Sequence, residues 1–121
     1  MASICDTLER IVRSYGYIVH RKTETATQCL IDFRHPNVEP RFPMAYFLSS
    51  LVYDKERNYM EVTVRSKPKG DYKELYLDYC CENGEMACRP HVWFEEKIVS
   101  VEAKFHEKPI EKLKSLLSEM L

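Results

Sequence analysis

The stretch YKELYLDYCCENGEMACRPHV, residues Tyr72–Val92, decides the fold that this sequence predicts. Asn83-Gly84 is the strongest short signal for a two-residue hairpin turn, because both residues accept the positive φ angles that such a turn requires. The turn fixes which residues lie opposite each other on its two strands, and it places Asp78 opposite Arg89. The stretch therefore predicts a hairpin with a defined register.

The two faces of this hairpin differ in chemistry, because side chains alternate between the faces along each strand. The expected core face carries Leu75, Leu77, Tyr79, Cys81, Met86, Cys88, Pro90 and Val92. The opposite face carries Tyr76, Asp78, Cys80, Ala87, Arg89, His91 and Trp93.

The register extends to a third strand over Ile98–His106. Val101 then lies opposite Pro90, and Glu102 lies opposite Arg89, so the apolar face continues across the sheet. Because proline has no N–H to donate, we expect a bulge or a gap in this ladder near Pro90. The resulting acid–base–acid row consists of Asp78, Arg89 and Glu102.

Helices are expected at both ends of the chain. Ser3 is a typical N-cap, Asp6 completes a capping box, and apolar residues recur at helical spacing up to Tyr15. Gly16 is typical of a helix end. Pro109 suits the first turn of a closing helix, which carries one apolar stripe formed by Ile110, Leu113, Leu116, Leu117 and Met120.

Two further hairpins are expected between the helix and the Tyr72–Val92 hairpin. Residues Tyr17–Arg34 form the first. In the second, Asn58 takes the left-handed position of a three-residue loop, so that Val52 faces Val62. The arm Met44–Val52 is apolar on both faces, which predicts a central strand, with a short buried helix as the alternative.

These elements predict one α+β domain over residues 1–121. Its antiparallel sheet has about six strands, built from three successive hairpins, and the N- and C-terminal helices pack on one face. The composition, 45% hydrophobic and 31% charged, is that of a globular domain. A net charge of −1 gives no global attraction to nucleic acid or to an anionic membrane, so we expect neither as a partner.

Five cysteines at irregular spacing do not indicate a disulfide framework, so no disulfide is expected. A reducing cytoplasm, of its own cell or of a host cell, is the expected location. No export signal and no apolar run of membrane-spanning length is visible. Cys5 falls on the edge of the helical apolar stripe, which favours core packing over a reactive thiol.

A metal site is not expected. Cys80, Cys81, Cys88 and His91 resemble zinc ligands by residue type, but the hairpin register places Cys81 and Cys88 on one face and Cys80 and His91 on the other. No phosphate loop or nucleophile motif occurs, so no cofactor is expected.

The candidate binding site is the polar face of the sheet. Tyrosine, tryptophan and arginine commonly anchor interfaces, although the Pro-rich loop could instead cover Trp93. The predicted partner- or ligand-binding residues are Tyr76, Arg89, His91, Trp93, Asp78 and Glu102. Secondary loop contacts are predicted at Arg34, Arg41, Lys67 and Lys69, with His35 among the same loop charges.

The leading interpretation is a small non-catalytic interaction protein, an adaptor, chaperone or inhibitor, that binds a protein partner through a sheet face or edge. The alternative is a domain that binds or sequesters a small polar or nucleotide-like ligand. An enzyme that uses Tyr76, His91 and Asp78 is the third reading. A homodimer would pair through Met44–Val52 or through the closing helix.

Overall fold

The computed structural model describes residues 3–39, 48–66, 89–93 and 98–121, with the backbone alone over 89–93 and 98–99. The Asn83-Gly84 turn and its first strand lie outside the described residues. The elements, in chain order, are α1 (Ile4–Ser14), β1 (Ile18–Glu24), β2 (Gln28–Arg34), β3 (Ser49–Asp54), β4 (Tyr59–Ser66), β5 (Arg89–Trp93), β6 (Ile98–Phe105) and α3 (Pro109–Glu119).

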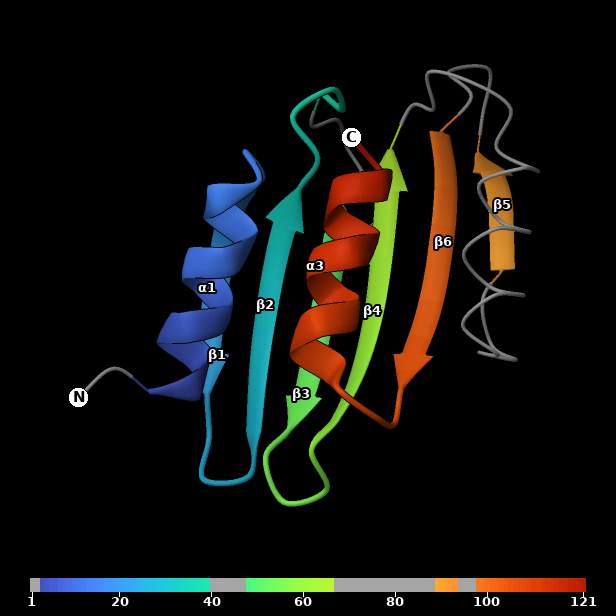
Figure 1. Cartoon of the computed structure of the whole chain (residues 1–121). Coiled ribbons are helices and arrows are strands. Elements are labelled where there is room, and N and C mark those ends of the chain that lie inside the picture. The colour runs from blue at the N-terminus through green and yellow to red at the C-terminus, as the bar shows by residue number, and fades with distance from the viewer. Residues whose placement is uncertain (1–2, 40–47, 67–88, 94–97) are drawn as a thin grey trace.

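The strands form one antiparallel sheet of six strands in the order β1-β2-β3-β4-β6-β5. Helices α1 and α3 lie side by side on the same face of this sheet (Figure 1). The predicted α+β class, with both terminal helices on one face, is confirmed. The strand β6 enters between β4 and β5, so the last strand of the chain is not at the edge of the described sheet.

Helix α1 begins as its sequence predicts. The Ser3 hydroxyl accepts from the Asp6 N–H, and the Asp6 carboxylate accepts from the Ser3 N–H, so the capping box is complete. Gly16 follows the helix with a φ of 91°, a conformation that glycine adopts without strain. Helix α3 begins at Pro109, where a missing N–H costs no helical hydrogen bond.

The hairpin of β3 and β4 has a longer turn than predicted. Asn58 does adopt a left-handed conformation, with a φ of 49°. Asp54 pairs with Tyr59, however, so four residues form the turn and Leu51, not Val52, lies opposite Val62. The predicted Val52–Val62 pair was wrong because one extra turn residue shifts every cross-strand partner by one.

The prediction of a central strand at Met44–Val52 is confirmed for its described part. Strand β3 lies between β2 and β4 and alternates buried and half-buried residues. Residues 44–47 lie outside the described residues.

The predicted register between β5 and β6 is confirmed. Arg89 lies opposite Glu102, Pro90 opposite Val101 and Val92 opposite Val99. The expected bulge or gap near Pro90 is wrong, because the Cα partners run from Arg89 to Trp93 without a shift or an interruption. A proline removes one donor but adds no residue, and β5 is the outermost strand on this side of the described sheet, where proline is tolerated.

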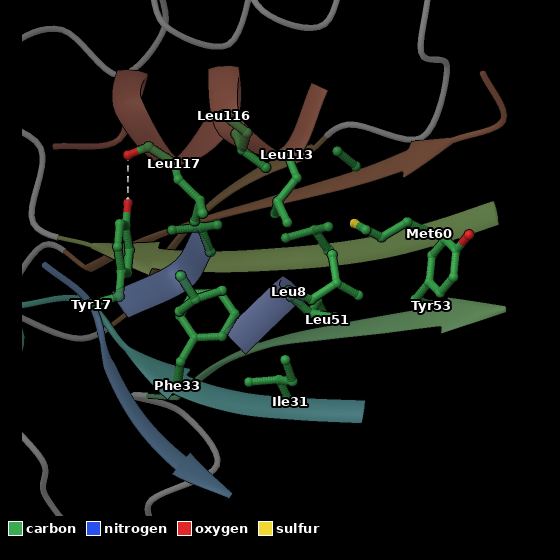
Figure 2. Close-up of a cluster of buried hydrophobic side chains, with 14 of the residues drawn as sticks. Leu8, Tyr17, Ile31, Phe33, Leu51, Tyr53, Met60, Leu113, Leu116 and Leu117 are labelled. Atoms are coloured by element: carbon green, nitrogen blue, oxygen red, sulfur yellow. Dashed lines mark hydrogen bonds between the residues drawn. The ribbon is translucent and has the colours of Figure 1, made fainter. Parts of the chain in front are cut away.

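The core lies between the sheet and the two helices (Figure 2). Phe33, Leu51 and Met60 from the sheet meet Leu8 of α1 and the leucines of α3, all fully buried or nearly so. The hydroxyl of Tyr17 donates to the main-chain oxygen of Leu117 at 2.9 Å, which joins the start of β1 to the end of α3.

A disulfide joins Cys5 of α1 to Cys29 of β2, with the two Cα atoms 5.4 Å apart. The prediction of no disulfide was therefore wrong. Cys5 was expected in the core, and both residues are fully buried there. The spacing of the cysteines in the sequence does not indicate that the first turn of α1 lies against the start of β2. This contact brings Cys5 and Cys29 together.

Strand β1 contains a bulge that re-aims its side chains. Val19 pairs with Phe33 but Arg21 pairs with Asp32, so His20 is the extra residue. The bulge sends Arg21 to the sheet face away from the helices and Lys22 toward α1. There the Lys22 ammonium contacts the carboxylates of Asp6 at 2.6 Å and Glu9 at 3.1 Å.

In the described part of the chain, neither helix approaches the length or apolar character needed to cross a membrane. Each of α1 and α3 has 11 residues.

The helix-free face of the sheet as the candidate functional site

The sheet face opposite α1 and α3 is the candidate site, and we call it the helix-free face because neither of these two described helices packs on it. Residues on β2, β3, β4 and β6 that alternate with the core residues point to it. Most of its described side chains are at least partly exposed, in contrast to those of the core face, but Ser100, opposite Arg65, is buried. The helix-free face includes Leu30, Asp32, Ser50, Val52, Glu61, Thr63, Arg65, Ser100, Glu102, Lys104 and, through the bulge, Arg21.

One row of this face crosses the whole described sheet. Asp32 lies opposite Ser50, Ser50 opposite Thr63, and Thr63 opposite Glu102. At one end of the row, Arg21 pairs with Asp32 through an ion pair of 3.0 Å. At the other end, Arg89 is the Cα partner of Glu102. The row therefore has the Arg21–Asp32 ion pair at one end and the register position of Arg89 opposite Glu102 at the other.

Arg65 lies near the end of β4 and is the best-described cation of the helix-free face. Its main-chain N–H donates to the Ser49 hydroxyl at 2.9 Å, and its Nη1 donates to the main-chain oxygen of Leu48. Its Nε is buried and has no hydrogen-bond partner among the described residues. Desolvation lowers the pKa of the Arg65 guanidinium, and attraction to Glu102 opposes that change. Within the described residues Arg65 makes no ion pair.

A hollow of about 350 Å³ lies beside Arg65. Its volume is at the lower end of the range for small-ligand sites and suits one side chain or a small ion. The hollow is lined by Arg21, Asp32, Leu48, Ser49, Ser50 and Arg65.

The predicted site residues are distributed around this face. Glu102 is half-buried in β6. Arg89, His91 and Trp93 lie in β5, where His91 is the Cα partner of Ser100. Tyr76 and Asp78 lie outside the described residues. The predicted binding site therefore stays a prediction. Of its cross-strand pairs, the structure confirms that Arg89 lies opposite Glu102.

Of the four predicted loop cations, Arg34 alone is described; Arg41, Lys67 and Lys69 lie outside the described residues. Arg34 ends β2 and its Nη1 donates to the main-chain oxygen of Val38 at 2.7 Å, so it supports the turn that follows.

His35 is not the exposed loop charge that the sequence suggested. It is 2% exposed, and its Nε2 lies 2.7 Å from the main-chain oxygen of Met120. The Asn37 N–H donates to its Nδ1, and the Tyr17 ring packs edge-on against it. The neighbouring prolines predicted a solvated loop. The contact with the end of α3 was missed because no pattern in the residues around His35 indicates it.

The described carboxylates with shifted pKa values are salt-bridge partners. Lys22 lowers the pKa of Asp6 and of Glu9, and Lys55 lowers the pKa of Glu24, in each case chiefly by hydrogen bonding to the ionised group. Hydrogen bonds from the main-chain N–H and the side chain of Arg57 lower the pKa of Asp54. These shifts favour the charged form, whereas a general acid needs a raised pKa.

No three histidine, cysteine or acidic side chains converge as metal ligands in the described ranges. Cys80, Cys81 and Cys88 lie outside them.

The outer edge of the sheet at β1 is a poor surface for strand addition. Its residues are mostly exposed, and the bulge at His20 together with Arg21, Lys22 and Glu24 interrupts a flat apolar edge. Bulges and charges on an edge strand oppose pairing with another chain. Of the two predicted surfaces, the sheet face is therefore favoured over this edge.

In their described parts, the two elements named for a homodimer are engaged mainly within the fold. Strand β3 is paired on both sides, and the α3 stripe is buried against the sheet through Leu113, Leu116 and Leu117. The homodimer itself stays a prediction.

Sequence reasoning missed Arg65 and Arg21 as members of the site. Alternation along Tyr59–Ser66 could have placed Arg65 opposite the apolar face of Met60, Val62 and Val64. No pattern in the sequence predicts the bulge at His20, which turns Arg21 to the same face. This arrangement is suited to binding an anionic group, because it combines a guanidinium with unused N–H donors, two ion-paired neighbours and hydroxyl groups.

Comparison of the chain with protein-family models, with curated proteins and with solved structures gave no match.

Proposed function

We propose that this protein is a non-catalytic binding protein that holds a protein partner against the helix-free face of its sheet. One observation carries the proposal: α1 and α3 both cover the same face, and the opposite face presents apolar and polar side chains together. Leu30 and Val52 are cross-strand partners there and both are half-buried. Mixed apolar and arginine-rich surfaces are typical of protein interfaces.

A second candidate is the binding of a small anionic ligand. The hollow beside Arg65 favours it, because its volume and its guanidinium suit a small polar molecule. An enzyme stays third. The shifted carboxylates of the described residues are held in their charged form by lysine or by Arg57, and this arrangement favours binding over proton transfer.

The cellular compartment of the protein also stays a proposal, because the sequence and the disulfide favour different compartments. The sequence favoured a reducing cytoplasm. The Cys5–Cys29 disulfide favours an oxidising compartment, because disulfides persist there. Fractionation of cells after thiol blocking, followed by detection of the oxidised protein, decides between the two compartments.

The test of the proposed function is a selection of displayed random peptides on the immobilised protein. Selected peptides are then measured by fluorescence polarisation on Leu30→Gln, which makes the helix-free face more polar. Leu121→Gln is the matched control, because Leu121 is 40% exposed at the end of α3. We expect about tenfold weaker binding for Leu30→Gln, the change that ~1.4 kcal/mol produces, and unchanged binding for the control.

Two results would contradict the proposal. The first is a selection that yields no binding peptide. The second is a set of peptides that bind Leu30→Gln and Leu121→Gln equally well. Circular dichroism of both variants establishes that the fold is retained before the affinities are compared.

A further inference from the structure

We propose that the hollow beside Arg65 binds a single carboxylate, supplied by an aspartate or glutamate side chain of the protein partner. The source of the carboxylate rests on the proposed function above. The carboxylate site itself is argued from the geometry and charge of the hollow.

The first argument is the unused hydrogen-bonding capacity of Arg65. A guanidinium has five N–H donors, and the Arg65 group donates to the main-chain oxygen of Leu48 through Nη1. Its Nε is buried without a partner, which is costly for a charged group. Because Nε is buried, a planar carboxylate would meet the two Nη groups at the end of the guanidinium, from which it can accept two parallel hydrogen bonds.

The second argument is that the structure already holds Arg65 in place. The Ser49 hydroxyl accepts a hydrogen bond of 2.9 Å from the main-chain N–H of Arg65, where the pairing of β3 with β4 ends. The main-chain oxygen of Leu48 accepts from the Arg65 guanidinium. Two consecutive residues at the start of β3 thus fix both the backbone and the guanidinium. A preorganised arginine loses little conformational entropy when it binds.

The third argument is the charge of the hollow. Arg21 and Asp32 neutralise each other through an ion pair of 3.0 Å, so Arg65 is the cation of the described lining that makes no direct ion pair. A monoanion matches that charge. A dianionic phosphate carries one charge more than Arg65 offers, and Glu102, which lies diagonally across β4 and β6 from Arg65, would repel that excess charge.

The bulge at His20 contributes to the site through Arg21. Because the bulge turns Arg21 to the helix-free face, Asp32 has a cation of its own at 3.0 Å. Asp32 is therefore already paired and does not compete as the anion for Arg65. The charge that the hollow offers to a ligand thus depends on one inserted residue in β1.

The test is an NMR titration of the folded wild-type protein, followed at the Nε–Hε resonance of Arg65. The probes are the N-acetyl methylamides of glutamate and of glutamine, and methyl phosphate. We expect a saturable downfield shift with the glutamate probe, no shift with the glutamine probe, and a smaller shift with methyl phosphate. These comparisons require no variant, so they remain valid whatever the stability of an Arg65 mutant.

Two variants localise the effect. In Arg65→Lys, which keeps the charge but loses the planar fork, the shifts of neighbouring amide resonances should weaken. Arg57→Gln is the control, because Arg57 is exposed in the turn after β3 and pairs with Asp54 at 2.9 Å. The Arg65 shift should persist there. Equal shifts with the glutamate and glutamine probes, or a larger shift with methyl phosphate, would overturn the proposal.

The peptide selection separates this proposal from the proposed function. Selected peptides that share an acidic position and lose affinity for Arg65→Lys support both. Selected peptides without an acidic position, together with no NMR shift, overturn the carboxylate site and leave the binding face in place. An NMR shift without any selected peptide supports the carboxylate site and contradicts the protein-binding role.

Discussion

The Nε2 atom of His35 lies 2.7 Å from the main-chain oxygen of Met120, which is 85 residues later in the chain. Because Nδ1 accepts from the Asn37 N–H, Nε2 carries the proton and donates to Met120. The buried imidazole thus connects the turn after β2 to the end of α3. We expect His35→Ala to lower the free energy of unfolding by about 2–4 kcal/mol, from the cavity and the unpaired main-chain groups.

Urea denaturation measures this loss. His20→Ala is the control, because His20 is exposed in the β1 bulge. A loss of stability no larger in His35→Ala than in His20→Ala would show that the contact with Met120 is not maintained in solution.

The Cys5–Cys29 disulfide should stabilise the fold by restricting the unfolded chain. For a loop with a sequence separation of 24, the expected contribution is about 3 kcal/mol. Peptide mapping of the unreduced protein by mass spectrometry should recover the linked pair. Cys5→Ala with Cys29→Ala should unfold at lower urea concentration than the oxidised protein. Recovery of both cysteines as free thiols from carefully oxidised protein would contradict the linkage.

Lys22 should make the stability depend on pH on the acid side. It lowers the pKa of Asp6 and of Glu9, so the stabilisation is present above their ordinary values near pH 4 and is lost as the pH falls through the lowered values. We expect Lys22→Met to flatten the dependence of the urea midpoint on pH in this range. Lys104→Met, an exposed lysine of β6, should keep the dependence of the wild type.

Tyr17 should make the stability depend on pH on the alkaline side. Burial raises the pKa of its phenol above the ordinary value of 10, so the unfolded chain ionises first as the pH rises. The stabilisation is present below pH 10 and decreases by about 1.4 kcal/mol per pH unit above it. Tyr17→Phe should show a shallower decrease above pH 10. Identical slopes for the two proteins in urea denaturation would refute the burial of the phenol.

Tyr17→Phe also removes a hydrogen bond at neutral pH. The Leu117 oxygen would lose its donor at 2.9 Å, which should cost about 1 kcal/mol. The same measurement at pH 7 therefore serves as an internal check on the alkaline result.

Local patterns predicted those parts of the fold that local chemistry determines. The Ser3 capping box, the start of α3 at Pro109 and the register of Arg89 with Glu102 follow from spacing that a few neighbouring residues set. The β3–β4 register was missed by one residue because an asparagine in the left-handed conformation is compatible with turns of three or four residues.

Contacts between distant segments could not be predicted in the same way. The disulfide, the burial of His35 and the pairing of Arg21 with Asp32 each join residues from different elements. Their geometry depends on how α1, α3 and the β1 bulge pack onto the sheet. The candidate site changed for this reason: those of its predicted members that are described lie in β5 and β6, while its best-described cation, Arg65, lies in β4.

The position of β6 between β4 and β5 has a consequence for synthesis of the protein on the ribosome. Residues 98–105 complete the sheet beside β4, and residues 109–119 then cover part of its apolar face. Until both segments have emerged, β2, β3 and β4 expose apolar side chains such as Phe33, Leu51 and Val62. The nascent chain therefore completes its core late, and its earlier strands depend on protection from aggregation during translation.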